Sequence, residues 1–207
     1  MLSSAVTTFV RSALPAPSAR VLEVGAGSGE LAAALADAGY EVVAIDPAPG
    51  SAAVRAVSLH EVDEPPASFD AAVAVVSLHH VEPLEPSCRR LGELVRPGGV
   101  LVVDEFDVER FDERAARWQI ERRREHGHGD HGHDDAGSVV AHLRDHLHGL
   151  ERVRAALHEW FAVGEPVRGP YLYRWDLPPG LRDAEEELIA AGRLPATGAR
   201  LVGTRRP

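Results

Sequence analysis

The 207-residue sequence is poor in cysteine, in basic side chains and in long apolar runs. Its single cysteine, Cys88, can form no disulfide within the chain, which favours a reducing compartment and predicts a cytoplasmic location. Basic residues number 22 against 32 acidic ones, for a formal net charge of -10. Because binding to a nucleic-acid backbone needs a basic face, we expect no nucleic-acid partner.

No stretch approaches the roughly 18 apolar residues that a membrane-spanning helix needs, so we expect no membrane partner. Residues 1–17 lack a basic start and a long apolar stretch, and predict a short helix rather than a signal peptide. Aromatic residues make up only 5% of the chain, but hydrophobic residues reach 44%, which is enough for a core. These features predict a soluble protein, either a monomer or a homodimer.

Apolar runs alternate with helical patterns in the first half of the chain. Buried strands are predicted over 19–24, 40–46, 69–77 and 100–106, a weaker strand over 52–58, and helices over 30–39 and 86–99. Near-continuous apolar strands between helices are typical of a parallel sheet covered on both faces. The pattern therefore predicts a doubly wound α/β fold.

The pattern changes after residue 106. Residues 109–161 predict a helical insertion, which we expect to act as a lid over the sheet. A charged helix that runs into a tract of His, Gly and Asp is predicted over 109–137, and a second helix over 138–161. A terminal strand is predicted over 169–177, a helix over 181–194 and a last strand over 198–206, with Tyr171, Tyr173 and Trp175 sharing one face of the first of these strands. Core packing is the favoured interpretation of these three aromatic residues.

The segment VLEVGAGSGELAAALADAGYEVVAIDPAPG, residues 21–50, places three glycines between a strand and a helix. A dinucleotide-binding loop needs a small residue where Glu30 stands. Glu23 and Glu30 flank the helix N-terminus, where two carboxylates would repel a pyrophosphate. They suit a ligand that carries an ammonium and a sulfonium. Asp46 ends the second strand, where a carboxylate can accept hydrogen bonds from both ribose hydroxyls.

This segment is similar to motif I of the class I S-adenosylmethionine-dependent methyltransferases. Residues 68–81 resemble the fourth strand and following loop of that family, and 91–106 resemble its next helix and fifth strand. The resemblance covers 18–107 as a cofactor-binding core, with a looser match at 169–206. It implies a single domain over 1–207 whose sheet has seven mostly parallel strands, the last antiparallel. It also implies a type 11-like enzyme that methylates a small molecule.

The resemblance implies that S-adenosyl-L-methionine is the cofactor and that its contacts come from Glu23, Gly25, Gly27, Gly29, Asp46, Leu59, His60 and Ser77. Glu23 would hold the amino group, and Gly25 and Gly27 would approach the methionine part. Asp46 would bind the ribose. Leu59 or His60, just after the weak third strand, would lie beside the adenine, although this segment lacks the usual aspartate. Ser77 would face the methionine or the methyl group.

Four residues are candidates for the catalytic base, which is needed only if the acceptor loses a proton. His79 and His80 follow the fourth strand and are the first choice, with packing beside the cofactor as the alternative. Asp104 and Glu105 follow the fifth strand, where a shaping role is favoured over catalysis.

Seven of the eleven histidines lie between His126 and His148. His142 and His146 are four residues apart on a predicted helix, a usable metal spacing. A solvated glycine-rich loop is nevertheless favoured over a substrate-facing lid or a metal site, and no metal ligand is predicted.

Two tryptophans of the insertion, Trp118 and Trp160, could cap an acceptor pocket. Two other functions stay open at this point. One is an NAD-dependent oxidoreductase, and the other is a non-catalytic metal-binding or regulatory protein on a methyltransferase scaffold.

Overall fold

The computed structural model describes residues 4–127, 135–175 and 177–207. Its helices are α1 (Ser4–Ala13), α2 (Glu30–Asp37), α3 (Leu84–Leu94), α4 (Glu113–Glu125), α5 (Ala136–His146), α6 (Leu150–His158) and α7 (Leu181–Ala190). Its strands are β1 (Arg20–Val24), β2 (Glu41–Asp46), β3 (Arg55–Ala56), β4 (Phe69–Val75), β5 (Val95–Phe106), β6 (Phe161–Val163), β7 (Val167–Gly169) and β8 (Gly198–Arg205). Short 3-10 helices cover Leu59–Glu61, Leu78–His80, Val108–Arg110 and Leu172–Arg174.

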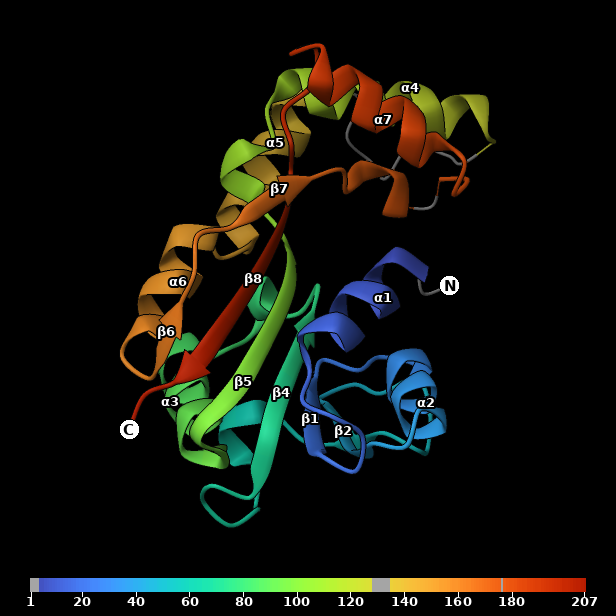
Figure 1. Cartoon of the computed structure of the whole chain (residues 1–207). Coiled ribbons are helices and arrows are strands. Elements are labelled where there is room, and N and C mark those ends of the chain that lie inside the picture. Colours follow the sequence, from blue (N-terminus) through green and yellow to red (C-terminus); the bar gives the residue numbers. More distant parts are fainter. Residues whose placement is uncertain (1–3, 128–134, 176) are drawn as a thin grey trace. The chain divides into compact units, whose positions relative to one another are not determined.

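The strands form a sheet in the order β3-β2-β1-β4-β5-β8-β6, with β7 paired to β8 (Figure 1). β1 pairs in parallel with both β2 and β4, so the strand order reverses between β1 and β4. β6 pairs with β8 in the antiparallel direction. The predicted mostly parallel methyltransferase-type sheet is confirmed, but it has eight strands and not seven, because two short strands precede α7.

The chain divides into two compact units. One comprises Met1–Glu105, Glu151–Pro166 and Arg200–Pro207, and the other comprises Phe106–Leu150 and Val167–Ala199. The insertion predicted over 109–161 is therefore divided, because nearly all of α6 groups with the sheet. Its action as a lid stays a prediction.

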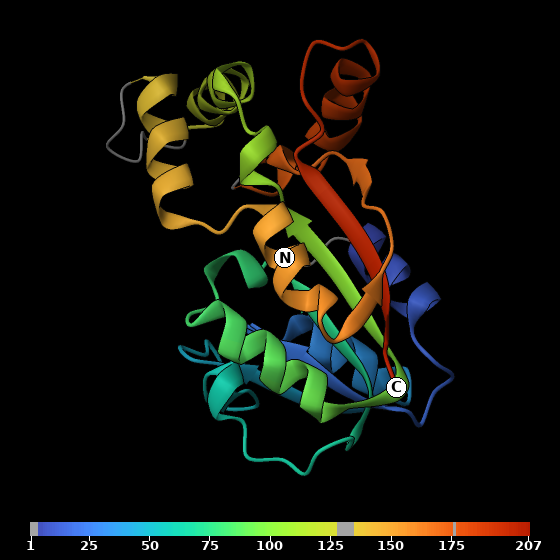
Figure 2. The same cartoon turned by 90° about the vertical axis from the view of Figure 1, so that its left-hand side faces the viewer.

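Helices cover both faces of the sheet in the first unit (Figures 1 and 2). On one face, Val10 of α1 and Leu35 of α2 pack against Val73 of β4 in a fully buried cluster. On the other, α3 and α6 lie together, and Trp160, just after α6, packs directly on Gly92 of α3. Trp160 is thus held half-buried inside this unit, and its role in capping an acceptor pocket stays a prediction.

Two predicted helix boundaries are wrong. The helix predicted over 86–99 ends at Leu94, and β5 already begins at Val95. Gly98 adopts a φ of +75° inside β5, so the Pro-Gly-Gly run shapes the start of a strand and does not end the helix. The helix predicted over 138–161 is broken after His146, because Leu147 takes up extended backbone angles.

The strand predicted over 169–177 is also wrong. β7 ends at Gly169, and Pro170 has no N–H to continue a strand ladder. The next N–H groups turn toward one carboxylate instead: Glu185 of α7, which is 0% exposed, accepts hydrogen bonds at 2.8–3.0 Å from Tyr171, Leu172 and Tyr173. Tyr171 and Tyr173 are buried in the structure, as their predicted core role requires.

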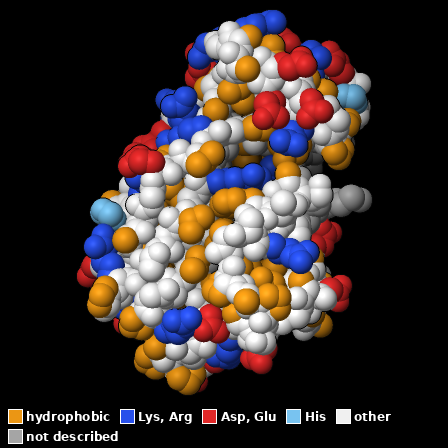
Figure 3. Space-filling view, in the orientation of Figure 1, with side chains coloured by type: hydrophobic (Ala, Val, Ile, Leu, Met, Phe, Trp, Pro, Cys, Tyr) orange, Lys and Arg blue, Asp and Glu red, His pale blue; other side chains and the backbone are white. Residues whose placement is uncertain are grey.

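Charged side chains of both signs are interspersed on the face shown in Figure 3. At the amino ends of the strands they form ion pairs, with Glu64 lying 2.9 Å from Arg20 and 2.6 Å from Arg55. These two arginines hold the pKa of Glu64 below its usual value. None of the helices that the structure describes is long and apolar enough to cross a membrane.

The contact of Gly92 with Trp160 gives a test of the packing. A Cβ atom at Gly92 would lie 2.4 Å from Cγ of Trp160. We expect Gly92→Ala to lower the free energy of unfolding by about 1–3 kcal/mol, because overpacking outweighs the better helix propensity of alanine. Denaturant unfolding measures the change. Gly180→Ala is the control, since its φ is -64° and its Cβ would meet nothing within 4 Å. Equal stability of the two variants would contradict the packing.

Candidate functional site

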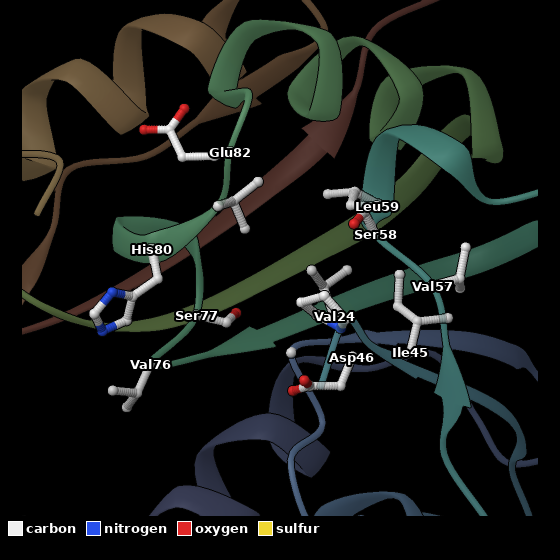
Figure 4. Close-up of a pocket in the computed structure, with 13 residues that line it drawn as sticks. Val24, Ile45, Asp46, Val57, Ser58, Leu59, Val76, Ser77, His80 and Glu82 are labelled. Atoms are coloured by element: carbon white, nitrogen blue, oxygen red, sulfur yellow. The ribbon is translucent and has the colours of Figure 1, made fainter. Parts of the chain in front are cut away.

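A cleft of about 220 Å³ opens at the carboxyl ends of β1, β2 and β4 (Figure 4). It lies where the strand order reverses, which is the usual ligand site of open α/β sheets. Five of the predicted site residues line it: Gly25, Asp46, Leu59, Ser77 and His80. In the view of Figure 4, Ser77 lies between His80 and Asp46, and Leu59 lies above Asp46.

The backbone of the loop between β1 and α2 explains its glycines. Gly25, Gly27 and Gly29 have φ angles of +70°, +52° and +80°, which residues with a side chain rarely adopt. Gly25 lies directly against Ser77, because a Cβ there would be 2.3 Å from the Ser77 Cβ. A Cβ at Gly27 would meet nothing within 4 Å, so there is open space beside it, although neither Gly27 nor Gly29 lines the cleft. The loop thus exposes main chain beside the cleft.

Asp46 has a structural contact that the sequence did not predict. Its Oδ2 accepts the Gly27 N–H at 2.9 Å, and its Oδ1 accepts the Ala48 N–H at 2.8 Å. The carboxylate therefore ties the glycine loop to the end of β2. Each carboxylate oxygen keeps a second lone pair that can accept a hydrogen bond from a ligand.

Glu23 is not on the cleft wall and is only 4% exposed. Its carboxyl group is hydrogen-bonded to the backbone of Ala32 in α2. Its Oε2 has no hydrogen-bond partner among the described residues. Burial raises the pKa of Glu23 to about 7. A buried carboxyl with an unpartnered oxygen is suited to a cationic ligand group.

The structure separates the two residues predicted beside the adenine. Leu59 lines the cleft and is 4% exposed, whereas His60 does not line it. Sequence reasoning missed Ser58 and Glu82, which line the cleft next to predicted residues, and six apolar wall residues: Val24, Ile45, Pro47, Val57, Val76 and Val81. Their position beside the motif residues at strand ends is the signal that could have found them.

The two catalytic candidates also occupy different places. His80 is exposed and lines the cleft, whereas His79 is 4% exposed and does not. Nδ1 of His79 is hydrogen-bonded to Glu105, and its ring centroid lies 4.3 Å from that of His80. Ser77 is 7% exposed, and its Oγ has no hydrogen-bond partner among the described residues. Ser77 and His80 are thus the polar groups of the 76–80 turn that face the cleft.

The second pair of candidates has structural contacts. Asp104 is 4% exposed and forms an ion pair with Arg200, at 2.8 Å from its Nε. Glu105 accepts hydrogen bonds from the turn that contains Ser77. Neither residue lines the cleft, which agrees with the shaping role that the sequence favoured.

Among the described residues, no group of three or more His, Cys, Asp or Glu side chains is placed to hold a metal ion. The rings of His142 and His146 lie 4.2 Å apart on α5. The middle of the histidine tract, residues 128–134, lies outside the described residues.

A family model described as a methyltransferase domain matches residues 3–134. The chain belongs to this family, and the class predicted from motif I, the class I S-adenosylmethionine-dependent methyltransferases, is confirmed. No curated protein matches the sequence significantly.

Solved methyltransferase structures share the fold. The 1,6-didemethyltoxoflavin-N1-methyltransferase of Burkholderia thailandensis is 19% identical, with a TM-score of 0.59 over 99% of this chain and 78% of its own. A methyltransferase of Mesorhizobium loti is 18% identical, with a TM-score of 0.59 over 95% of each chain. Phosphoethanolamine N-methyltransferase 2 of Haemonchus contortus is 14% identical, with a TM-score of 0.62 over 99% of this chain and 53% of its own.

The open space at Gly27 gives a test of the loop. We expect Gly27→Val to abolish binding of S-adenosylhomocysteine, because the new side chain would occupy the space that a ligand needs. Isothermal titration calorimetry measures the loss. The control is Gly98→Val in β5, where φ is +75° and a Cβ would also meet nothing within 4 Å. Both variants should lose about 1–3 kcal/mol of stability through backbone strain. Normal binding by the Gly27 variant would show that the loop is only a turn.

Proposed function

We propose that this protein transfers the methyl group of S-adenosylmethionine to a small-molecule acceptor. The observation that carries the proposal is the charge of the site. The cleft is lined by Asp46 and Glu82, with no Lys or Arg among its described lining residues, and Glu23 lies buried beside the glycine loop. Carboxylates attract a sulfonium and an ammonium, whereas the pyrophosphate of NAD would be repelled.

Two relatives support a small acceptor. The Burkholderia thailandensis enzyme was solved with 1,6-didemethyltoxoflavin and S-adenosylhomocysteine bound. The Haemonchus contortus enzyme is named as a phosphoethanolamine N-methyltransferase and was solved with S-adenosyl-L-methionine. We extend the small-molecule substrate class, but no particular substrate, from these proteins to this chain.

The cofactor would supply an electrophilic methyl group on its sulfonium. Glu23 does not line the cleft, so its Oε2, which lacks a partner among the described residues, would hold the amino group directly or through water. Asp46 would accept the ribose hydroxyls with the lone pairs left by Gly27 and Ala48. Leu59 would pack against the adenine. These contacts leave Ser77 on the wall nearest the methionine part, directly beside Gly25.

His80 is the candidate base where the acceptor loses a proton, because it is the histidine that lines the cleft. His79 would act only through its neighbours. For an acceptor without a proton to lose, alignment and exclusion of water would supply the acceleration.

Calorimetry with S-adenosylhomocysteine, NAD and zinc tests the proposal against both alternatives. We expect the first to bind and the other two not to bind. Asp46→Ala should weaken S-adenosylhomocysteine binding by about 1.5–3 kcal/mol, because the ribose loses a charged partner. The control is Asp70→Ala, which removes a carboxylate that also accepts a backbone N–H, at 2.8 Å from Arg20, but at the other end of the strands. NAD binding or zinc binding without S-adenosylhomocysteine binding would overturn the proposal.

The raised pKa of Glu23 predicts a pH dependence. Below its pKa of about 7 the carboxyl is mostly neutral, and only its ionised form attracts the cofactor's ammonium. Binding therefore releases a proton, and affinity should rise by up to about tenfold per pH unit from about pH 5.5 to pH 7, then level off. The cofactor amino group should stay charged across this window. Glu23→Gln should bind more weakly with a flat profile. A flat profile in the unaltered protein would contradict the role of Glu23.

A further inference from the structure

The turn that carries Ser77 and His80 begins with an unusual backbone conformation. Val76, on the cleft wall, has a φ of +53°. This region is rarely populated by β-branched residues and costs about 1–3 kcal/mol. Such a conformation persists only where the surrounding structure holds it.

The end of β5 holds this turn. The Val76 N–H donates to the carbonyl oxygen of Asp104 at 2.8 Å. The N–H groups of Ser77 and Leu78 both donate to Oε1 of Glu105, at 2.8 Å and 2.6 Å. Glu105 is 1% exposed, so these bonds form away from water, where a lost partner is costly.

The other oxygen of the same carboxylate contacts a catalytic candidate. Oε2 of Glu105 is hydrogen-bonded to Nδ1 of His79. A carboxylate that accepts two backbone N–H groups is acceptor-only in its ionised form, so Nδ1 of His79 is the donor. A neutral His79 ring then carries its lone pair on Nε2. This ring packs against the ring of His80, with 4.3 Å between the centroids.

We propose that Glu105 is a positioning residue for methyl transfer. Its Oε1 holds the strained turn that keeps Ser77 and His80 on the cleft wall, and its Oε2 fixes the tautomer and orientation of His79. Glu105 does not line the cleft and acts through these neighbours. This inference rests on the proposed function, since the cleft wall matters only if the cleft binds the cofactor.

Two substitutions distinguish the roles of the two carboxylate oxygens of Glu105. Glu105→Gln keeps an amide oxygen that can accept the N–H groups of Ser77 and Leu78, but its NH₂ group cannot accept from Nδ1 of His79. Glu105→Ala removes both contacts. The readouts are S-adenosylhomocysteine affinity by calorimetry and the imidazole ¹⁵N resonances of His79, which report the tautomer without any acceptor.

We expect the Nδ1–H tautomer of His79 in the unaltered protein and its loss in Glu105→Gln. The affinity of Glu105→Gln for S-adenosylhomocysteine should stay within about twofold of that of the unaltered protein. Glu105→Ala should bind the same ligand at least about tenfold more weakly. Adding Val76→Gly to Glu105→Ala should recover part of the affinity, because glycine adopts a positive φ without strain. Val76→Gly alone supplies the baseline for this comparison.

Glu185→Gln is the matched control. Glu185 is also buried and also holds a 3-10 turn through three backbone N–H groups, but the turn that it holds does not line the cleft. The Glu185→Gln substitution should lower the stability of the protein without changing the His79 resonances or the affinity for S-adenosylhomocysteine.

Unchanged affinity for S-adenosylhomocysteine in folded Glu105→Ala, or unchanged His79 resonances in Glu105→Gln, would overturn the inference. Should Glu105→Ala not fold, the Gln variant still decides it. If the unaltered protein does not bind S-adenosylhomocysteine, the proposed function is wrong. The His79 resonances would still show whether Glu105 fixes the tautomer of His79.

Discussion

Where the chain leaves a strand, its backbone N–H groups lose their hydrogen-bond partners on the neighbouring strand. In this protein, carboxylates accept hydrogen bonds from these N–H groups. Asp46 accepts from the glycine loop, and Glu105 accepts from the turn after β4. Glu185 does the same for the turn after β7. An ionised carboxylate offers several acceptor sites in one rigid group, so one side chain can fix a whole turn. The shape of the cleft depends on the first two of these contacts.

Carboxylates also set the charge of the cleft and its surroundings. Asp46 serves both as an anchor for the loop and as a free acceptor toward the cleft. Glu23 lies in a buried place where its ionised form is costly, which is why its pKa is raised to about 7. A cationic ligand offsets that cost, whereas an anionic ligand would add to it. The family assignment and the charge of the cleft therefore point to one ligand chemistry by separate routes.

His79 and His80 show how neighbouring residues of one type can have different roles. The 3-10 turn from Leu78 to His80 directs one ring into the protein against Glu105 and leaves the other exposed on the cleft. Adjacent residues on such a turn point in different directions, so a motif of two histidines does not mean two bases. Only the exposed ring can meet an acceptor directly.

The sequence by itself determined the central parallel strands and the glycine loop after β1, because both depend on local patterns. The strands around Leu22, Ile45 and Val73 are continuous apolar runs, and Gly25 and Asp46 stand at fixed distances from them. Only the tertiary structure decided the ends of α3, the break between α5 and α6, and the turn at 171–173. The partners of Glu105 and Glu185 were equally beyond prediction, because they lie 26 to 28 and 12 to 14 residues away along the chain. A buried carboxylate accepts the N–H groups that the fold brings close to it, and the periodicity of hydrophobic residues in the sequence does not indicate which groups these are.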